Sequence, residues 1–210
     1  MRLRKIKEAQ TILQEDSMYV VQQPTDWKGK WNQLFQNRQP IHLEIGMGKG
    51  KFLLELALQH PEINFIGMEK YDSVLLKALQ KAIPHQVKNL KLLWFDAADI
   101  ETIFDQNELD CIYLNFSDPW PKTKQKKRRL TFPTYLAKYR LVRKPDAPIR
   151  FKTDNFPFFM DSMMSFVETN HSVDSIILDL HSHPEIENVE TEFETKFKTQ
   201  GKWIYQIICH

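Results

Sequence analysis

The chain has 210 residues, of which 42% are hydrophobic and 27% charged, an ordinary composition for a soluble globular protein. No apolar run approaches the roughly 20 residues of a membrane-spanning helix, and no signal segment follows the basic amino-terminal residues, so neither a membrane protein nor a secreted one is expected. A formal net charge of +2 does not by itself indicate a nucleic-acid binder. Cys111 and Cys209 lie in apolar runs and are expected to be buried thiols in a reducing, cytoplasmic compartment.

The first forty residues differ from the rest because they lack sustained periodicity, although they contain the pair Trp27 and Trp31. We expect an irregular arm over residues 1–40 with a mobile end, packed onto one main domain over residues 41–210.

Strands and helices alternate through the main domain. Strands are predicted at 41–45, 64–69, 90–95, 110–116, 149–153, 175–180 and 203–209. Helical spacing of apolar residues predicts helices beginning near Phe52 and Asp72, and over 135–142 and 156–169. The apolar strands look buried on both faces, so the fold class is α/β, with a doubly wound and mostly parallel sheet.

Five unusual residues follow directly on predicted strand ends: Gly46, Glu69, Asp96, Asp118 and Asp154. In doubly wound sheets, ligands bind beyond the carboxyl ends of the strands, so these residues are expected to share one rim. Helix capping explains any one of the acidic residues equally well, but it explains the whole set poorly.

A glycine cluster, Gly46, Gly48 and Gly50, lies between a predicted strand and a predicted helix, where it allows close approach to a ligand. The dinucleotide fingerprint requires another glycine at 51, where this chain has Lys51. An acidic residue about 20 positions on, here Glu69, is placed to hold a pair of ribose hydroxyls.

Glu44 before the glycines, with Glu69 and Asp96 at later strand ends, resembles the S-adenosylmethionine pocket of class I methyltransferases. That cofactor carries a sulfonium and an ammonium group and no phosphate, so clustered carboxylates suit it, whereas they repel a pyrophosphate. An NAD-linked enzyme remains the alternative for this half of the chain.

The segment 115–122, Asn-Phe-Ser-Asp-Pro-Trp-Pro-Lys, is the most specific in the chain. Its two prolines bracket Trp120 and fix the backbone, so a base stacks on Trp120 while Asp118 is held in place. A structural turn with a packing tryptophan is the alternative. Exocyclic-amine methyltransferases place the aromatic residue after two adjacent prolines, which argues against adenine-N6 chemistry without excluding it.

Four motifs occur in the order found in the bacterial tRNA (guanine-N7)-methyltransferase family, and together they resemble that family closely. They are residues 44–50, residues 116–122 with the basic run that follows, residues 151–154 and residues 191–197. The resemblance covers most of the chain from Glu44 onward. Two positions depart from the family pattern: Met47 replaces a smaller residue, and Phe193 replaces a tyrosine and so lacks its hydroxyl.

The resemblance implies a Rossmann-like class I methyltransferase that uses S-adenosyl-L-methionine to methylate guanosine N7 in tRNA, in the variable loop. It implies cofactor-binding roles for Glu44, Gly46, Gly48, Gly50, Glu69, Asp96 and Asp118, of which Asp118 is also the catalytic residue. It implies substrate-binding roles for Lys122, Asp154, Thr191, Glu192, Phe193 and Glu194. Guanine N7 carries a lone pair and no proton, so no general base is needed, and Asp154 or Glu194 is expected to accept from guanine N1–H and N2–H₂.

A dense basic run follows the loop, and its position next to that loop predicts contacts with the tRNA backbone. Its members are Lys124, Gln125, Lys126, Lys127, Arg128 and Arg129. An ordinary solvated loop is the alternative.

No metal is expected, because His181 and His183 have no third ligand at a familiar spacing. The apolar stripe over 156–166 is interpreted as helix packing, part of which could form a subunit interface, so monomer and homodimer both stay open. Two other functions also stay open: a methyltransferase with another acceptor, and a non-catalytic RNA-binding protein on a degenerate fold.

Overall fold

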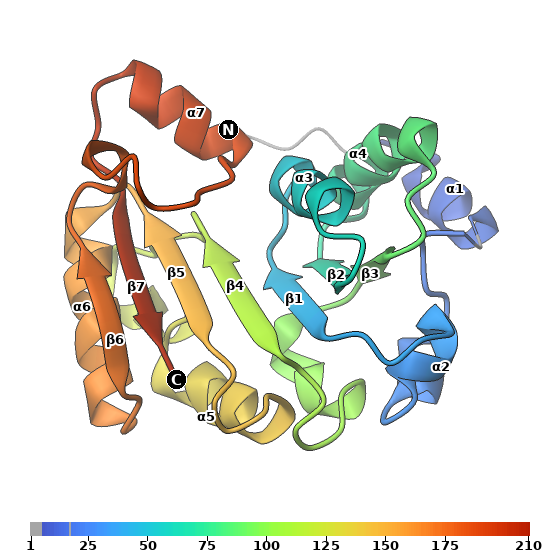
Figure 1. The fold of residues 1–210 in the computed structure, drawn as a ribbon, viewed down its shortest axis with the longest axis horizontal. Helices are drawn as coiled ribbons and strands as arrows, with labels where there is room; N and C mark the ends of the chain where they lie inside the picture. Colours follow the sequence, from blue (N-terminus) through green and yellow to red (C-terminus); the bar gives the residue numbers. More distant parts are fainter. Residues whose placement is uncertain (1–5, 17) are drawn as a thin grey trace.

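The computed structural model describes residues 6–16 and 18–210, which contain a seven-stranded sheet with helices on both faces (Figure 1). The mobile end expected for the arm falls on residues outside this range. The strand order is β3-β2-β1-β4-β5-β7-β6, and only β7 runs antiparallel to its neighbours. The mostly parallel, doubly wound sheet is therefore confirmed. The strands are β1 Ile41–Ile45, β2 Asn64–Glu69, β3 Leu90–Trp94, β4 Cys111–Asn115, β5 Ile149–Thr153, β6 Val173–Ile177 and β7 Tyr205–Cys209.

The sheet separates two apolar cores. On one face, Leu43, Leu114 and Phe151 pack with residues of α5 and α6, and on the other, Phe65 packs with residues of α3 and α4. The helices are α1 Ala9–Glu15, α2 Trp31–Phe35, α3 Lys51–Gln59, α4 Asp72–Ala82, α5 Pro133–Val142, α6 Phe156–Glu168 and α7 Glu192–Thr199. Cys111 and Cys209 are buried and free, as expected.

The order of strands reverses at β1, since β2 and β3 follow on one side and β4 and β5 on the other. In open α/β sheets this switch point is where ligands bind. The glycine loop follows β1, and α7 lies beyond the carboxyl ends of β4 and β5 (Figure 1). The topology therefore brings the motifs of the first and last thirds of the chain to one rim.

The structure differs locally from these expectations. The arm is not wholly irregular, since it contains α1, α2 and the short 3-10 helix η1 (Pro24–Trp27). Each of these helices is too short to show a periodic pattern in the sequence. Helix α7 was not predicted, and the strand expected over 175–180 ends at Ile177. Within the arm, Val20 pairs with Leu92 at the edge of β3, and the buried Trp31 donates its Nε1–H to the carbonyl of Ile103.

Candidate active site

The glycine loop adopts a conformation that side chains rarely tolerate. Gly46, Gly48 and Gly50 have φ angles of 73°, 61° and 73°, all in the left-handed region. The N–H of Gly48 donates to Glu69 Oε2 at 3.2 Å, and the N–H of Tyr71 donates to Glu69 Oε1 at 3.0 Å. Glu69 therefore supports the loop from the end of β2, and its burial raises the pKa of its carboxyl.

Met47, the larger residue that departs from the family pattern, is accommodated by Gly67 in β2. A Cβ atom at Gly67 would lie 1.9 Å from Met47 Sδ, so even alanine does not fit there. The loop thus keeps its conformation because the neighbouring strand provides the room.

Glu44 is a buried carboxyl group with only one of its oxygens engaged by the described residues. Its Oε1 accepts from Asn115 Nδ2 at 2.9 Å, whereas Glu44 Oε2 and Asn115 Oδ1 are buried and have no hydrogen-bond partner within residues 6–16 and 18–210. Burial raises the pKa of Glu44 to about 8, against the opposing effects of Asn115 and Lys152. Two unpartnered buried acceptors side by side are costly in isolation and suit a ligand with N–H donors.

A narrow cavity joins the glycine loop to the start of α7, with a volume of about 50 Å³. This is well below the roughly 300–1,000 Å³ of typical small-molecule pockets, so the cavity in this conformation does not enclose a whole ligand of cofactor size. Glu192 of α7 is tied to the opposite side by Lys81 at 2.5 Å and Lys49 at 3.7 Å. The lining residues are Glu44, Gly46, Met47, Gly48, Lys49, Gly50, Lys51, Phe52, Asn115, Phe116, Thr191, Glu192 and Phe193.

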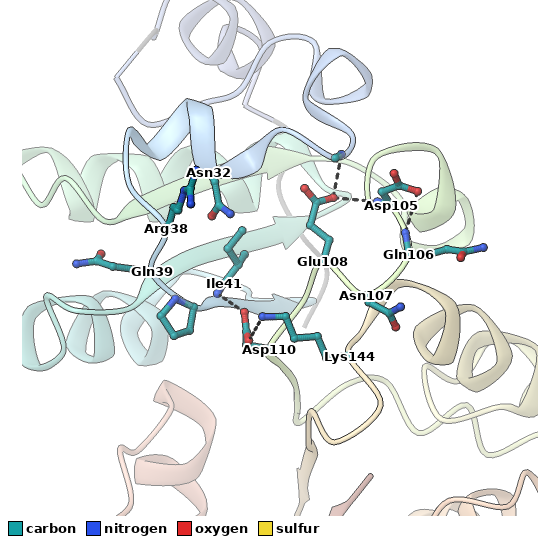
Figure 2. A pocket seen from close by; sticks show the side chains of 12 residues that line it. Asn32, Arg38, Gln39, Ile41, Asp105, Gln106, Asn107, Glu108, Asp110 and Lys144 are labelled. Carbon is teal, nitrogen blue, oxygen red and sulfur yellow. Dashed lines mark hydrogen bonds and ion pairs between the residues drawn. The ribbon is translucent and has the colours of Figure 1, made fainter.

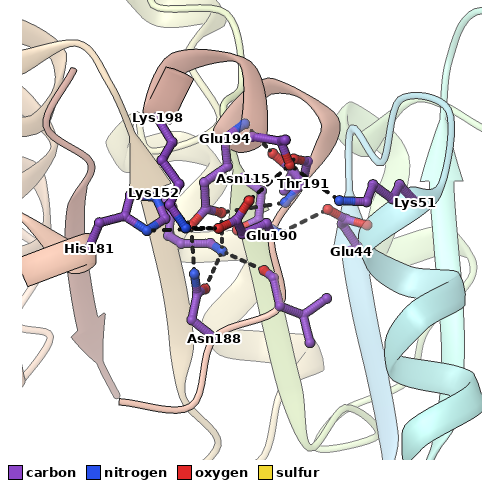
Figure 3. A network of polar contacts seen from close by, with 12 residues as sticks. Glu44, Lys51, Asn115, Lys152, His181, Asn188, Glu190, Thr191, Glu194 and Lys198 are labelled. Atoms are coloured by element: carbon purple, nitrogen blue, oxygen red, sulfur yellow. Dashed lines mark hydrogen bonds and ion pairs between the residues drawn. The ribbon is translucent and has the colours of Figure 1, made fainter. Parts of the chain in front are cut away.

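A buried polar network fixes the start of α7 (Figure 3). Thr191 Oγ1 accepts from the N–H of Glu194 at 2.9 Å, and Glu194 Oε2 accepts from the N–H of Thr191, which forms a capping box. Lys152 Nζ donates to Glu194 Oε2 at 2.7 Å, and Asn188 Nδ2 donates to Oε1 at 2.6 Å. Glu194 is fully buried and both of its oxygens accept hydrogen bonds from the chain itself, which argues against its predicted contact with a nucleotide.

The loop after β4 places Asp118 in solvent, outside the cavity, and puts two non-glycine residues in the left-handed region. These are Phe116, with a φ of 50°, and Trp120, with a φ of 38°. The guanidinium of Arg128 lies 5.0 Å from the ring centroid of Trp120, a cation–π contact. One face of Trp120 is therefore already covered.

The basic run divides into exposed and engaged side chains. Lys122, Lys124, Lys127 and Arg128 are exposed, and Gln125 and Lys126 are half-buried. Lys126 Nζ pairs with Asp161 at 2.8 Å. Arg129 is buried and hydrogen-bonded within the chain, which argues against its predicted contact with RNA.

Asp96 and Asp154 also lie at strand ends but outside the cavity. Asp96 Oδ1 accepts from the N–H of Ala98 at 3.0 Å, so the capping alternative holds for this residue. Asp154 Oδ2 pairs with Lys202 Nζ at 2.7 Å, and the Asp154 side chain is 19% exposed.

A larger cavity of about 360 Å³ lies at the opposite edge of the sheet, beside the start of β1 (Figure 2). Glu108 accepts there from the N–H groups of Gly29 and Asp105. Asp110 accepts from the N–H of Ile41 and pairs with Lys144 at 2.5 Å. These two carboxylates are used by the chain itself, so the narrow cavity at the carboxyl edge is the better candidate site.

Known proteins resemble this chain over nearly its whole length. Residues 38–207 match the family described as putative methyltransferase. The tRNA (guanine-N(7)-)-methyltransferase of Streptococcus sanguinis (strain SK36) is 44% identical over 207 residues, 99% of this chain and 98% of its own length. The enzyme of the same name from Enterococcus faecalis (strain ATCC 700802 / V583) is also 44% identical, over 99% of this chain and 97% of its own length. The chain belongs to the tRNA (guanine-N7)-methyltransferase family.

Solved structures support the fold. The chain resembles an antibiotic-related methyltransferase, with a TM-score of 0.65 and 16% identity, over 87% of this chain and 92% of the other. It also resembles the 16S rRNA methyltransferase KamB, with a TM-score of 0.64 and 16% identity, over 86% and 92% of the two chains. At this identity the likeness shows the class I fold alone.

The structure brings some of the expected residues together and leaves others apart. The cavity unites Glu44, the three glycines and Thr191 to Phe193, and Glu69 joins it through Gly48. Three residues of the site were not expected from the sequence, namely Asn115, Lys152 and Asn188, which bond to Glu44 or Glu194. The position of Asn115 at the end of β4 was the available signal.

Across residues 6–16 and 18–210, no cluster of three or more His, Cys, Asp or Glu side chains is arranged to hold a metal ion. Within those ranges, no helix is long and apolar enough to cross a membrane.

Proposed function

We propose that this protein transfers a methyl group from S-adenosyl-L-methionine to N7 of a guanosine in tRNA, in the variable loop. The observation that carries the proposal is the pair of unpartnered oxygens, Glu44 Oε2 and Asn115 Oδ1, beside a left-handed glycine loop in a chain 44% identical to enzymes of that name. We place the reaction in the cytoplasm, with monomer and homodimer both open.

The chemistry of these residues fits the cofactor. Glu44 and Asn115 offer acceptors to an ammonium group. Each oxygen of Glu69 accepts one backbone N–H and keeps a second lone pair that would accept from one hydroxyl of a ribose pair. Gly46 and Gly48 have no side chains, so a ligand can approach the backbone of this loop closely. When bound, the cofactor supplies an electrophilic methyl group on sulfur.

The chain needs no general base for this reaction. The N7 lone pair would accept the methyl group that the cofactor supplies, and N7 carries no proton that a residue of the chain would have to remove. Positive charge then develops on the purine, and the carboxylate of Asp118 on the adjoining loop would stabilise it. The work of the enzyme is orientation and electrostatics, with Trp120 as the stacking surface.

Asp154 is the remaining candidate to distinguish guanine from adenine, because Glu194 is already fully engaged. Guanine presents N1–H and N2–H₂ donors that adenine lacks, and a carboxylate accepting both would discriminate by about 1–3 kcal/mol. Asp154 would exchange its partner Lys202 for the base.

The test is transfer of labelled methyl from S-adenosyl-L-methionine to unmodified bulk tRNA, with nucleoside analysis of the digest. We expect 7-methylguanosine, and mapping of the label then checks the variable loop. Label on another nucleoside would overturn the N7 assignment while keeping the cofactor. No transfer by a protein that binds the cofactor would overturn tRNA as the acceptor.

A further inference from the structure

Within residues 124–129, all of which the structure describes, Arg129 alone is buried. Its side chain is 7% exposed, and its guanidinium makes three hydrogen bonds inside the chain. Nε donates to the carbonyl of Pro119 at 2.6 Å, Nη2 to the carbonyl of Trp120 at 3.4 Å, and Nη1 to Asp161 Oδ2 at 2.6 Å. Arg129 thus links the loop after β4 to helix α6.

The loop needs such support. Phe116 and Trp120 have left-handed φ angles, which non-glycine residues keep only when their surroundings hold them. Pro119 and Pro121 have no N–H, so the loop has few backbone donors of its own. The carbonyls that Arg129 holds are those of Pro119 and the left-handed Trp120.

Two adjacent arginines therefore act on different parts of the same loop. Arg128 is exposed, and its guanidinium lies over the ring of Trp120. Arg129 is buried and holds the backbone, while its guanidinium lies 5.1 Å from the ring centroid of Phe158. Asp161 on α6 is the residue that anchors Arg129, and Lys126 also pairs with it at 2.8 Å.

We propose that Arg129, anchored by Asp161, is a positioning residue that fixes the backbone of residues 116–121 and so holds Asp118 in place at the acceptor site, without contacting RNA. This rests on the function proposed above for that loop. A planar guanidinium can donate to two carbonyls and a carboxylate at once, whereas an ammonium on a flexible stem cannot hold all three.

The experiment begins with wild-type enzyme and tRNA, measuring kcat, KM and the salt dependence of tRNA affinity. Arg129→Lys keeps the positive charge but loses the planar set of N–H donors that the guanidinium provides. We expect kcat to fall at least tenfold, while the Kd for tRNA changes less than twofold. Arg38→Lys, exposed at the opposite edge of the sheet, is the matched control and keeps the wild-type kcat. Circular dichroism and thermal melting confirm that each variant is folded.

Asp161→Asn provides the second test, because it removes the anchor and leaves Arg129 charged. We expect kcat to fall, with tRNA affinity equal to or tighter than wild type, since a negative charge is lost. Combining Asp161→Asn with Arg129→Lys should add less than twofold to the loss in kcat, as for residues that act as one unit.

A wild-type kcat in folded Arg129→Lys or Asp161→Asn would overturn the inference. So would Arg129→Met, if it lowered the salt slope of tRNA binding by about one while kcat at saturating tRNA stayed intact, because that is the signature of a phosphate contact. If the wild-type enzyme itself forms no 7-methylguanosine, the proposed function fails and the inference falls with it.

Discussion

Acidic side chains have different partners in the two halves of the rim formed by the carboxyl ends of the strands. In the cofactor half, at the ends of β1, β2 and β3, no ion pair is formed by the acidic residues Glu44, Glu69 and Asp96 among the described residues. Their hydrogen-bond donors are the amide of Asn115 and backbone N–H groups. In the acceptor half, formed by β5, α6 and α7, each acidic residue named here pairs with a cation: Asp154 with Lys202, Asp161 with Arg129, and Glu194 with Lys152.

This difference distinguishes acidic residues that are available to a ligand from those that stabilise the fold. Acidic side chains without a cationic partner remain available to a cationic ligand, which favours their charged form, whereas the charge of the paired ones is already neutralised within the protein. Asp154 is the intermediate case, because its partner Lys202 is 45% exposed and can be displaced. Substitutions in the cofactor half should therefore act on cofactor affinity, and substitutions in the acceptor half on folding or on the base.

Asp154→Ala should give the largest effect and tests the separation most directly. We expect kcat/KM for tRNA to fall by about 10²-fold or more, since the base loses both a contact and its orientation. Cofactor Kd should change less than twofold when measured by calorimetry. Loss of cofactor binding in this variant would show that the two halves are not separate.

Lys202→Ala is the matched control for that substitution. It removes the ion pair and leaves the Asp154 carboxylate, so kcat/KM should stay within a few-fold of wild type. If Lys202→Ala reproduced the loss, Asp154 would matter through the pair and not through the base.

Glu69→Ala should give the next largest effect, in the cofactor half. Losing a carboxylate that accepts two hydroxyl hydrogens costs about 2 kcal/mol, or roughly 30-fold in cofactor Kd. Glu69→Gln keeps one acceptor for Gly48 N–H, so its loss should be smaller. A tRNA Kd that weakened as much as the cofactor Kd would contradict the assignment.

Much of the fold was predictable because its signals are local. The strands β1, β2 and β5 begin and end where the apolar runs do, and the glycine spacing predicted the loop after β1. Helix α7 was also readable, since Thr191 and Glu194 have the spacing of a capping box, but its eight residues are too few for a periodic pattern. Short elements carry too little sequence to be recognised alone.

The site was less predictable, because burial depends on distant partners. Arg128 and Arg129 are equivalent in the sequence, and the partners that hold Arg129 inward include Asp161, which lies 32 residues after it. The burial of Glu194 likewise follows from Lys152, 42 residues earlier. A motif predicts which residue types occur at a site, whereas the fold determines whether a charged side chain there is paired within the protein or available to a ligand.

The exposed part of the basic run provides a third test, on the acceptor side. Replacing Lys124, Lys127 and Arg128 with alanine should lower the slope of log affinity against log salt by about 2 to 3, and weaken tRNA binding about tenfold. Cofactor Kd should not change. Alanine at Lys28, Lys30 and Arg38, three exposed basic residues beside the cavity at the opposite edge, controls for net charge. An equal slope in both triple variants would mean that the run makes no phosphate contacts.

The smallest expected effect is the contribution of Glu44 to the pH dependence of the free energy of unfolding. Burial raises the pKa of this carboxyl from 4.5 to about 8, so the folded chain holds a proton that the unfolded chain releases. The stability that this provides is fully present below pH 4.5 and is lost as the pH rises through about 8. Glu44→Gln cannot ionise, so its free energy of unfolding should fall less than that of wild type between pH 6 and 9.

Binding a cation beside Glu44 should drive its proton off, because an ammonium next to the free Oε2 favours the charged carboxylate. At pH 7 we expect the wild type to release up to about one proton on binding S-adenosyl-L-methionine, and Glu44→Gln to release none. Calorimetry in phosphate and in Tris separates the two cases, since their ionisation enthalpies differ. The same binding enthalpy in both buffers for the wild type would mean that the unpartnered oxygen of Glu44 faces no cation, and that the cofactor half owes its affinity to Glu69 and the glycine loop.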